Sequence, residues 1–278
     1  MGGRLLRCGD RTLDLSEPVV MGVLNVTPDS FSDGGRFTDP DRAAEQASRM
    51  AEEGAAIVDI GGESTRPGAA LVTAAEEIDR VVPLVERLAG RIAAVISVDT
   101  SKPEVMRAAA LAGAGLINDV RALTAPGALA LAASTSCALC LMHLQGEPAT
   151  MQLQPAYRDV VSEVKAFLLE RVQACRALEV PEDRLVIDPG FGFGKTLAHN
   201  LELLRRLPEL AATGIPVLAG LSRKSMAGAI TGRPTSARLA GSLALAALAV
   251  ASGASIIRAH DVAETLDAVK IALAVKGR

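Results

Sequence analysis

The sequence MGVLNVTPDSFSDGG at residues 21–35 decides the fold class of this chain. Its first half continues an apolar, β-branched run at residues 19–26, which is the composition of a strand buried on both faces. Turn-forming Pro, Asp, Ser and Gly residues follow at once. The stretch therefore predicts a core strand that carries Asn25 at its carboxyl end and continues into a polar loop containing Phe31. Strand ends of this kind hold the active sites of α/β proteins.

The same pattern, an apolar run followed by polar residues, repeats along the chain. Strand-like runs occur at residues 19–26, 55–61, 93–98, 115–117, 137–142, 184–187, 215–221 and 255–257. Between them, apolar residues at i, i+3 and i+4 predict helices at residues 41–53, 73–88, 102–112, 127–133, 159–178, 200–210, 238–251 and 262–275. Glycines such as Gly54 and Gly253 are expected to end a helix just before the next strand.

Eight βα units without a linker or a change of composition predict one domain over residues 1–278. The expected fold is α/β, a (β/α)8 TIM barrel, which typically takes ~250 residues. Residues 4–15 are expected to form a short N-terminal β-hairpin that turns at Gly9, so that residues 1–16 cap one end of the barrel. A doubly wound sheet is the alternative. It would carry a dinucleotide glycine fingerprint after the first strand, where this chain has NVTPDS.

The balance of charge limits the partners that the chain can bind. With 29 Lys and Arg residues against 32 Asp and Glu residues, the net charge is −3. This argues against a general nucleic-acid binder, while a local basic site for a phosphorylated small molecule stays open. Cys137 and Cys140 form a CxxC inside an apolar run and not at a helix start, so we expect inert core thiols and a reducing, cytoplasmic compartment.

Two stretches bear on membrane contact. The amino-terminal MGGRLLRCGD lacks the continuous apolar region of a secretory signal. Residues 239–257 carry no charge, but they are rich in Ala, Gly and Ser, and they break at Gly253. We interpret them as a buried Ala-rich helix followed by a strand, not as a membrane span. Such a smooth helix could also pack against a second copy of the chain.

Polar side chains end almost every predicted strand, and in a barrel these ends meet on one face. The residues are Asn25, Glu63 to Arg66, Asp99, Thr100, Asn118, Asp119, His143, Asp188, Ser222 to Lys224, Arg258 and His260. Any one of them could instead be a helix N-cap or a turn residue. As a set, they offer planar donors and acceptors for a heterocycle, and cationic and neutral groups for a phosphate with its hard metal ion.

Two near-motifs do not meet their requirements. The segment GFGFGKT at residues 190–196 has one residue too few between its first and last glycines for a Walker A loop, so it is interpreted as a glycine-rich βα loop. His143, His199 and His260 lack the close spacing of a structural zinc site.

The motifs resemble those of a known family. The segments MGVLNVTPDSFSDGG, DIGGESTRPGA, SVDTSKPEV, INDV, LMHLQG, DPGFGFGK, GLSRKS and RAHDV are similar, in this order and over nearly the whole chain, to dihydropteroate synthases of bacterial folate biosynthesis. The resemblance implies a transferase that condenses p-aminobenzoate with 6-hydroxymethyl-7,8-dihydropterin diphosphate and releases pyrophosphate. It also implies the barrel fold, assistance by Mg²⁺ and a homodimer.

The resemblance further implies roles for individual residues. Asp99, Asn118, Asp188 and Lys224 correspond to the pterin-binding set, to which Met142 is added as a substrate contact, and Arg258 with His260 corresponds to the diphosphate site. Asn25 corresponds to the magnesium-linked residue. The surroundings of p-aminobenzoate correspond to Thr65, Arg66, Pro67, Phe193, Lys224 and Ser225, and Phe31 lies on a first loop that folds over the substrates. The residues expected to take part in catalysis are Asn25, Lys224, Arg258 and His260.

Two rival functions stay open at this point. A pterin-binding methyltransferase domain would act with a corrinoid module, for which the chain has no segment, and its loops would differ from NVTPDSFSDGG and STRPG. A catalytically dead paralogue would have lost Asn25, Arg66 or Arg258, which are all present. Because GGESTRPGA is the ordinary form of the second loop, we expect a sulfonamide-sensitive enzyme.

Overall fold

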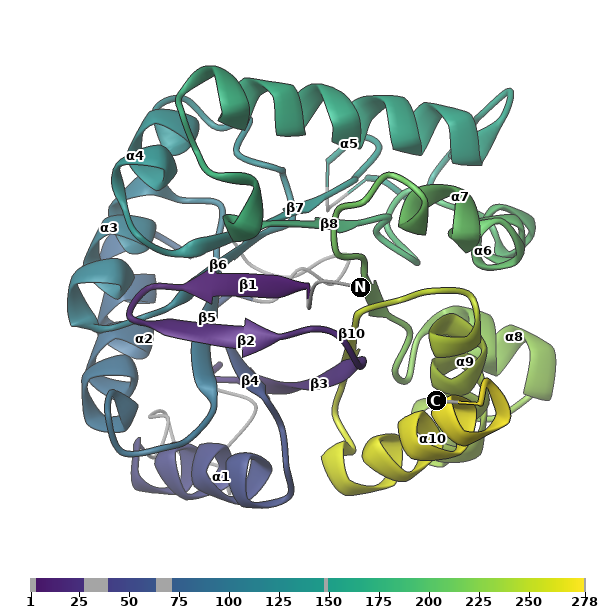
Figure 1. Ribbon diagram of the computed structural model, residues 1–278, viewed down its shortest axis with the longest axis horizontal. Coiled ribbons are helices and arrows are strands. Elements are labelled where there is room, and N and C mark those ends of the chain that lie inside the picture. The colour runs from purple at the N-terminus through teal and green to yellow at the C-terminus, as the bar shows by residue number, and fades with distance from the viewer. Residues whose placement is uncertain (1–3, 28–39, 64–71, 148–149, 278) are drawn as a thin grey trace.

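The core of the molecule is a closed barrel of parallel strands (Figure 1). A computed structural model describes residues 4–27, 40–63, 72–147 and 150–277 of the chain. The barrel strands are β3 (Val19–Asn25), β4 (Ile57–Gly61), β5 (Val95–Asp99), β6 (Leu116–Asp119), β7 (Ala138–Met142), β8 (Leu185–Asp188), β9 (Leu218–Gly220) and β10 (Ile256–Ala259). Their order is β8-β7-β6-β5-β4-β3-β10-β9, and a parallel bridge between Ile187 and Val217 joins the two outer strands. The predicted (β/α)8 barrel is confirmed.

Helices follow the strands and surround the barrel. They are α1 (Pro40–Glu52), α2 (Ala74–Leu88), α3 (Pro103–Ala112), α4 (Ala128–Ser134), α5 (Val160–Ala177), α6 (Leu197–Arg205), α7 (Leu207–Ala211), α8 (Ser225–Thr231), α9 (Leu239–Ala251) and α10 (Val262–Val275). Local signals fix several ends. Thr73 and Glu76 form a reciprocal capping box at the start of α2, and Gly113, at φ 109°, ends α3.

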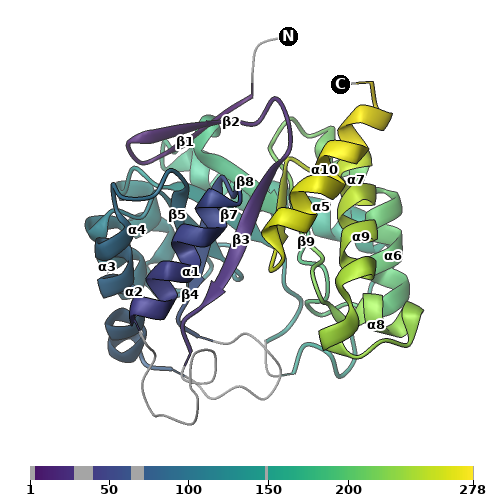
Figure 2. The same cartoon turned by 90° about the horizontal axis from the view of Figure 1, so that it is seen from below.

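The predicted hairpin closes the end of the barrel at which the strands begin, as Figure 2 shows. Its strands are β1 (Leu5–Cys8) and β2 (Arg11–Asp14). Leu6 and Cys8 are fully buried and pack with the first inward-facing residues of the barrel strands, such as Met21 and Ile57. The hairpin therefore supplies the apolar floor of the barrel, which leaves the opposite end for polar groups.

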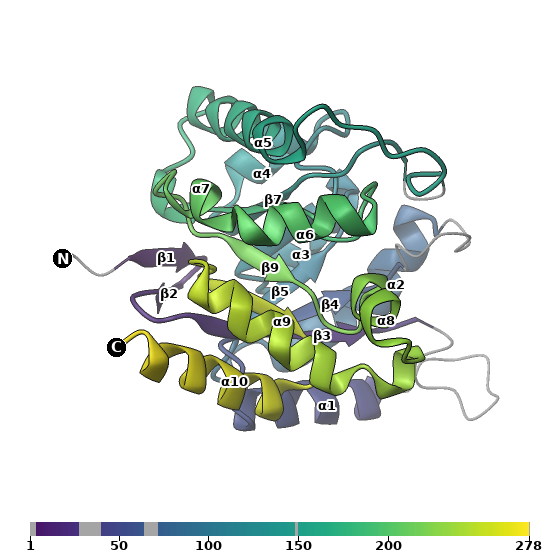
Figure 3. The same ribbon diagram turned by 90° about the vertical axis from the view of Figure 1, so that its right-hand side faces the viewer.

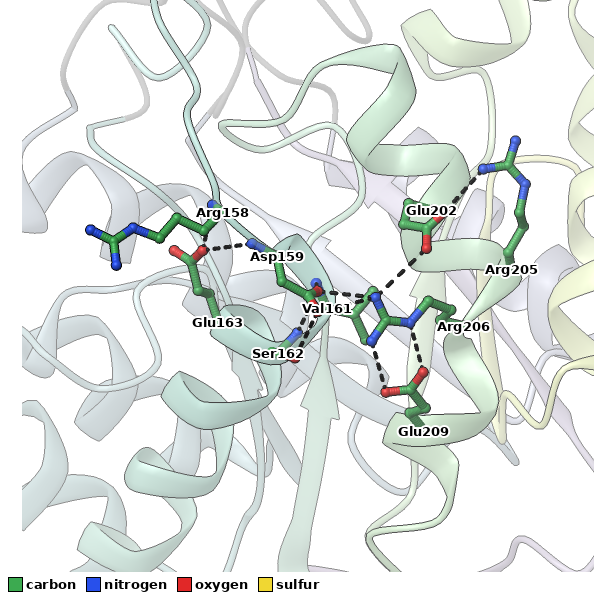
Figure 4. A network of polar contacts seen from close by, with 9 residues as sticks. All are labelled: Arg158, Asp159, Val161, Ser162, Glu163, Glu202, Arg205, Arg206 and Glu209. Carbon is green, nitrogen blue, oxygen red and sulfur yellow. Dashed lines mark hydrogen bonds and ion pairs between the residues drawn. The ribbon is translucent and has the colours of Figure 1, made fainter.

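The helix predicted at residues 200–210 is in fact two helices. α6 ends at Arg205, and α7 begins at Leu207 with Pro208 in its first turn. Proline has no N–H with which to continue the hydrogen bonds of α6. The side chain of Arg206 stabilises the break, donating to Glu209 at 2.6 Å and to Asp159, the N-cap of α5, at 3.1 Å (Figure 4). The prediction missed the break because the apolar spacing continues across it.

A second difference is α8, which was not predicted. It follows Lys224 directly, ends at Gly232 with φ 70°, and has only seven residues. So short a segment gives too few turns for an apolar period to stand out. Its position matters, because Lys224 is the N-cap residue of α8, and the helix therefore fixes the backbone of Lys224.

Residues 239–257 form α9 and then β10, as predicted. Among the residues that the structure describes, no helix is long and apolar enough to cross a membrane. Figure 3 shows α9 and α10 lying side by side on the outside of the barrel. Cys137 and Cys140, like Cys8 and Cys175, are free and buried, in agreement with the prediction of core thiols. Burial raises the pKa of Cys175 to about 11, so this thiol stays protonated at neutral pH.

Candidate active site

The inward-facing positions of the barrel change from apolar to polar along the strands. On β10, for example, Ile256 belongs to the apolar interior, Ile257 packs outward against the helices, and Arg258 faces inward again. The inward positions directly above the apolar layer are Val23, Asp59, Ser97, Asn118, Cys140, Asp188, Gly220 and Arg258. A polar layer therefore lies at the carboxyl ends of the strands, where active sites of such barrels are found.

Arg258 crosses the barrel mouth to contact two carboxylates. Its Nε donates to Oδ2 of Asp59 at 2.7 Å, and its Nη2 donates to Oδ2 of Asp99 at 3.0 Å. Asp59 is completely buried and also accepts hydrogen bonds from Ser97 Oγ at 2.6 Å and from Asn118 Nδ2 at 3.1 Å. Four strands are thus connected through one buried carboxylate.

The charges of this cluster shift the pKa values of Asp99 and Arg258. Burial raises the pKa of Asp99 to about 7, and the neighbouring Asp59 raises it while Arg258 lowers it. Burial alone would lower the pKa of Arg258, but Asp59 and Asp99 raise it above its usual range. At neutral pH Arg258 is therefore charged, while Asp99 can either donate or accept a hydrogen bond.

Lys224 and Asp188 form the other side of the polar layer. Lys224 Nζ donates to the carbonyl oxygen of Phe191 and lies 4.6 Å from the centre of the Phe193 ring. Burial lowers the pKa of Lys224 to about 8, and Asp188 raises it while Arg258 lowers it. Burial likewise raises the pKa of Asp188, and the Lys224 cation acts in the opposite direction. One oxygen of Asp188 accepts the N–H of Gly190 at 2.7 Å.

Two glycines at the carboxyl ends of β4 and β9 lie next to these groups. A Cβ atom on Gly220 would lie 3.8 Å from Lys224 Nζ and 3.9 Å from Arg258 Cβ. A Cβ atom on Gly61 would lie 3.6 Å from Asn25 Oδ1 and 3.8 Å from Asp99 Cβ. A side chain at either glycine would therefore project against these polar groups.

The remaining predicted residues in the described part of the chain lie around this layer. Met142 is buried and pairs in register with Asp188. His260 Nδ1 lies 3.0 Å from the hydroxyl of Ser222, and Ser225 is exposed at the start of α8. Asp119, by contrast, accepts the N–H groups of the turn that follows β6, at 2.8 Å from Arg121, so it is a turn residue and not part of the polar layer.

Four predicted residues lie outside the described part of the chain. They are Phe31 in the first loop, and Thr65, Arg66 and Pro67 in the second. Their expected roles remain predictions.

The oxygen donors fit a hard metal ion bound together with a diphosphate. Within residues 4–27, 40–63, 72–147 and 150–277, no group of three or more His, Cys, Asp and Glu side chains is placed to hold a metal ion by itself. Asn25 forms no hydrogen bond through its side chain within the same ranges, so its amide oxygen has no competing partner. Mg²⁺ typically takes few protein ligands and completes its shell with water and substrate phosphates. Asn25 could serve as one such protein ligand through its amide oxygen.

Asp59 and its hydrogen-bond donor Ser97 are two polar residues of this layer that the sequence analysis missed. A signal was available for Asp59, because an acidic residue inside the apolar run at residues 55–61 must be buried and hence paired. Its partner Arg258 is 199 residues away in sequence, and no local pattern indicates that pairing.

The arrangement suits a flat, polar, anionic ligand. Asp188 and Asn118 present planar oxygen and nitrogen atoms, which match the ring N–H and amino groups of a heterocycle. Arg258 and Lys224 supply positive charge that can neutralise an anion leaving from that ligand. Since these groups are mostly buried, water competes little with their hydrogen bonds.

Comparisons with known proteins agree with this geometry. Residues 21–260 match the family model described as pterin binding enzyme. Dihydropteroate synthase of Escherichia coli (strain K12) is 53% identical over 260 residues, which cover 94% of this chain and 92% of that protein. Dihydropteroate synthase of Xanthomonas albilineans, solved with 4-aminobenzoic acid, superposes with a TM-score of 0.93 at 52% identity, covering 99% of both chains. Dihydropteroate synthase of Yersinia pestis, solved with a sulfonamide drug, superposes with a TM-score of 0.93 at 51% identity, covering 99% of this chain and 100% of that one.

Proposed function

The chain belongs to the family of pterin-binding enzymes, and from this premise we propose how its polar layer carries out the reaction of a dihydropteroate synthase. That reaction is a transfer in folate synthesis. The amino nitrogen of p-aminobenzoate forms a bond to the methylene carbon of 6-hydroxymethyl-7,8-dihydropterin diphosphate. The bond from that carbon to the diphosphate oxygen breaks, pyrophosphate leaves, and the amine loses a proton, which gives 7,8-dihydropteroate.

The observation that supports this proposal most strongly is that two chemically different sets of side chains meet at the carboxyl ends of the barrel strands. Asp188 ends β8 and Asn118 lies near the end of β6, and Arg258 and Lys224 both lie next to Gly220. A pterin needs the first set for its ring donors, and a departing diphosphate needs the second for its charge.

We assign pterin recognition to Asp188, Asn118, Asp99, Lys224 and Met142. The carboxylate of Asp188 accepts from the ring N–H and the exocyclic amine of the pterin. Gly190 already occupies one side of this carboxylate with its N–H, which fixes the orientation of the free side. Asn118 is held in the same way, since its Nδ2 donates to Asp59 and leaves its oxygen to accept from the ligand.

We assign the leaving group to Arg258 and His260, with Asn25 as the residue that would hold Mg²⁺. When bound, the ion neutralises the charge that develops on the departing oxygens. Arg258 is positioned by Asp59 and keeps a guanidinium N–H face beyond its two carboxylates. The Ser222 hydroxyl orients the imidazole of His260.

We infer that pyrophosphate departs before the amine attacks. An arylamine is neutral at pH 7 and already nucleophilic, so it needs no strong base, and expulsion of the diphosphate is the harder step. The cation left on the methylene carbon is conjugated with the pterin ring. Positional exchange of labelled diphosphate oxygens in the absence of p-aminobenzoate is the expected sign of this order. A complete lack of exchange in the absence of p-aminobenzoate argues against it.

The p-aminobenzoate surroundings include Phe193, Lys224 and Ser225, together with Thr65, Arg66 and Pro67 of the second loop. We propose that sulfonamides compete for this place, because they share the aniline ring and a negatively charged group opposite it. If the sulfonamide concentration that gives half inhibition does not rise with p-aminobenzoate concentration, this assignment is contradicted.

Release of pyrophosphate, measured with and without p-aminobenzoate, tests the activity. We expect release that requires p-aminobenzoate and that falls when EDTA removes Mg²⁺. A methyltransferase domain releases no pyrophosphate, and an inactive paralogue binds pterin without turnover. Either result refutes the proposed activity.

We propose further that the chain forms a homodimer through α9 and α10. α9 carries no charged residue, yet Leu248 on it is 55% exposed, and on α10 Ile271 is 65% exposed. α9 and α10 pack side by side, and exposed apolar side chains on adjacent helices can form such an interface. Leu248→Asp is expected to give a monomer by sedimentation, whereas Leu111→Asp on α3, where Leu111 is 84% exposed, keeps the dimer. The buried free thiols support the expected cytoplasmic location.

A further inference from the structure

A second buried lysine, Lys195, lies behind the contact between Lys224 and Phe193. Its side chain is 3% exposed. Its Nζ donates to the carbonyl oxygen of Phe193 at 2.9 Å and to that of Gly190 at 3.0 Å, and it lies 3.0 Å from Nδ1 of His143. An ammonium group has three donors, so these contacts use all of them. Within the described residues Lys195 forms no ion pair with a carboxylate.

His143 acts as an acceptor in this arrangement. Burial lowers the pKa of His143 to about 3, and the Lys195 cation lowers it further, so the imidazole is neutral at physiological pH. Because an ammonium group can only donate, Nδ1 must accept. The ring is held edge-on to Phe167, with 5.1 Å between the ring centres. Lys195 is therefore fixed between a rigid imidazole and the carbonyls of one loop.

That loop, at residues 189–194, carries the groups on which Lys224 rests. The carbonyl of Phe191 accepts from Lys224 Nζ, and the ring of Phe193 lies under it. The loop packs so closely on the end of β7 that a Cβ atom on Gly190 would lie 2.0 Å from the carbonyl oxygen of His143. On its other side, Asn200 accepts the N–H of Gly192 at 2.7 Å.

We propose that Lys195 is a positioning residue that sets the place of Lys224 and of the Phe193 ring in the substrate site. Lys195 donates to the carbonyl oxygens of Gly190 and Phe193, which come before and after Phe191 in the loop. It thereby fixes the position of the Phe191 carbonyl oxygen, which accepts from Lys224 Nζ. The inference rests on the proposed function, in which Lys224 and Phe193 contact p-aminobenzoate. Lys195 itself touches no substrate.

Electrostatics adds a second connection between the two lysines. Burial lowers the pKa of Lys195 to about 7, Asp188 raises it, and the Lys224 cation lowers it. The groups that act on Lys224 are Asp188 from β8, Arg258 from β10 and Asp99 from β5. Both lysines therefore interact with the carboxylate of Asp188. Removal of Lys195 takes away one of these two cations, which should raise the pKa of Lys224.

Lys195→Met tests the proposal against the matched variant Arg184→Met. Arg184 is another buried cation that serves carbonyls, donating to Cys137 at 2.8 Å, but it lies at the amino end of β8, away from the polar layer. Two quantities are measured in each folded variant. One is the KM for p-aminobenzoate. The other is the pH midpoint for acylation of Lys224 by an amine reagent, mapped by mass spectrometry.

In Lys195→Met we expect the KM for p-aminobenzoate to rise by about tenfold or more, because a small displacement of a positioned group has effects of this size. The acylation midpoint of Lys224 should rise toward the ordinary value of a lysine. Arg184→Met should lose thermal stability but keep both quantities unchanged.

A folded Lys195→Met protein with an unchanged KM and an unchanged midpoint overturns the proposal, and so does an equal change in Arg184→Met. If Lys195→Met does not fold, Lys195→Gln, which keeps an amide donor, serves the same comparison. Acylation needs no turnover. A wild-type protein that releases no pyrophosphate would therefore refute the proposed function while the positioning of Lys224 could still be measured.

Discussion

Replacement of Asp59 by asparagine tests most directly the hydrogen-bonded contact of Asp59 and Asp99 with Arg258 in the polar layer. Asn keeps the size of the side chain but removes the charge that Arg258 contacts at 2.7 Å. Asp59 is completely buried, and removing one partner of a buried ion pair costs about 3–5 kcal/mol. Because Asp99 still contacts Arg258 at 3.0 Å, we expect the lower part of this range. With a loss of about 3 kcal/mol in a chain of this size, the melting temperature should fall by about 6–12 °C.

The same substitution should change how Asp99 titrates. Burial and the charge of Asp59 hold the pKa of Asp99 at about 7 in the folded protein, against 3.8 for an ordinary Asp. The folded state therefore binds more protons than the unfolded state between these values, and the contribution of Asp99 to stability falls as the pH rises from 4 to 7. In Asp59→Asn the pKa of Asp99 should move down, and this fall in stability with pH should become smaller.

The assays are thermal unfolding between pH 5 and 8 and the pH profile of kcat/KM for the pterin diphosphate. Asp119→Asn is the matched control. Asp119 is also completely buried and hydrogen-bonded, but it serves the turn after β6, and its charge raises the pKa of Asp99 less than that of Asp59 does. If Asp59→Asn and Asp119→Asn give the same pH profile, Asp59 does not control the ionisation of Asp99, and the reasoning is refuted.

Three further substitutions test other parts of the structure. Asp188→Ala should weaken pterin binding by about 100-fold or more, equivalent to about 2.7 kcal/mol, measured by calorimetry; retained affinity contradicts its assigned role. Gly190→Ala places a Cβ atom 2.0 Å from the His143 carbonyl oxygen and should destabilise the fold far more than Gly127→Ala, where no atom lies within 4 Å and only the positive φ is strained. Leu6→Ala removes a fully buried side chain from the hairpin and should lower the free energy of unfolding by about 2–5 kcal/mol in urea titrations, whereas a cost below about 1 kcal/mol would show that the hairpin does not plug the barrel.

The local signals in the sequence predicted the local structure well. The eight apolar runs became the eight barrel strands, and the capping residues Thr73 and Asp159 start helices where the sequence indicates. These features depend on hydrogen bonds and packing within a few residues, which the order of residues specifies directly. Where a short-range signal was weak, as at α8 and at the break before Leu207, the prediction failed.

The candidate site was predicted in part, for a reason that lies in the geometry of a barrel. Because parallel strands all end on one face, any polar residue at a strand end can be assigned to that face without knowledge of its neighbours. Asn25, the last residue of β3, is an example, as are Asn118 on β6 and Asp188 on β8. Whether a given residue faces inward follows from the period of two along each strand.

The sequence by itself therefore determined the fold class, the family and the placement of Asn118, Asp188 and Arg258 at strand ends on one face. Only the tertiary structure decided which of these residues contact one another. Arg258 on β10 reaches Asp59 on β4, past β3, from 199 residues away, and Lys195 binds His143 from 52 residues away. Strand order, barrel closure and the glycines that let the loops approach closely determine which of these residues come into contact. These are properties of the closed sheet, and no short segment of the chain carries them.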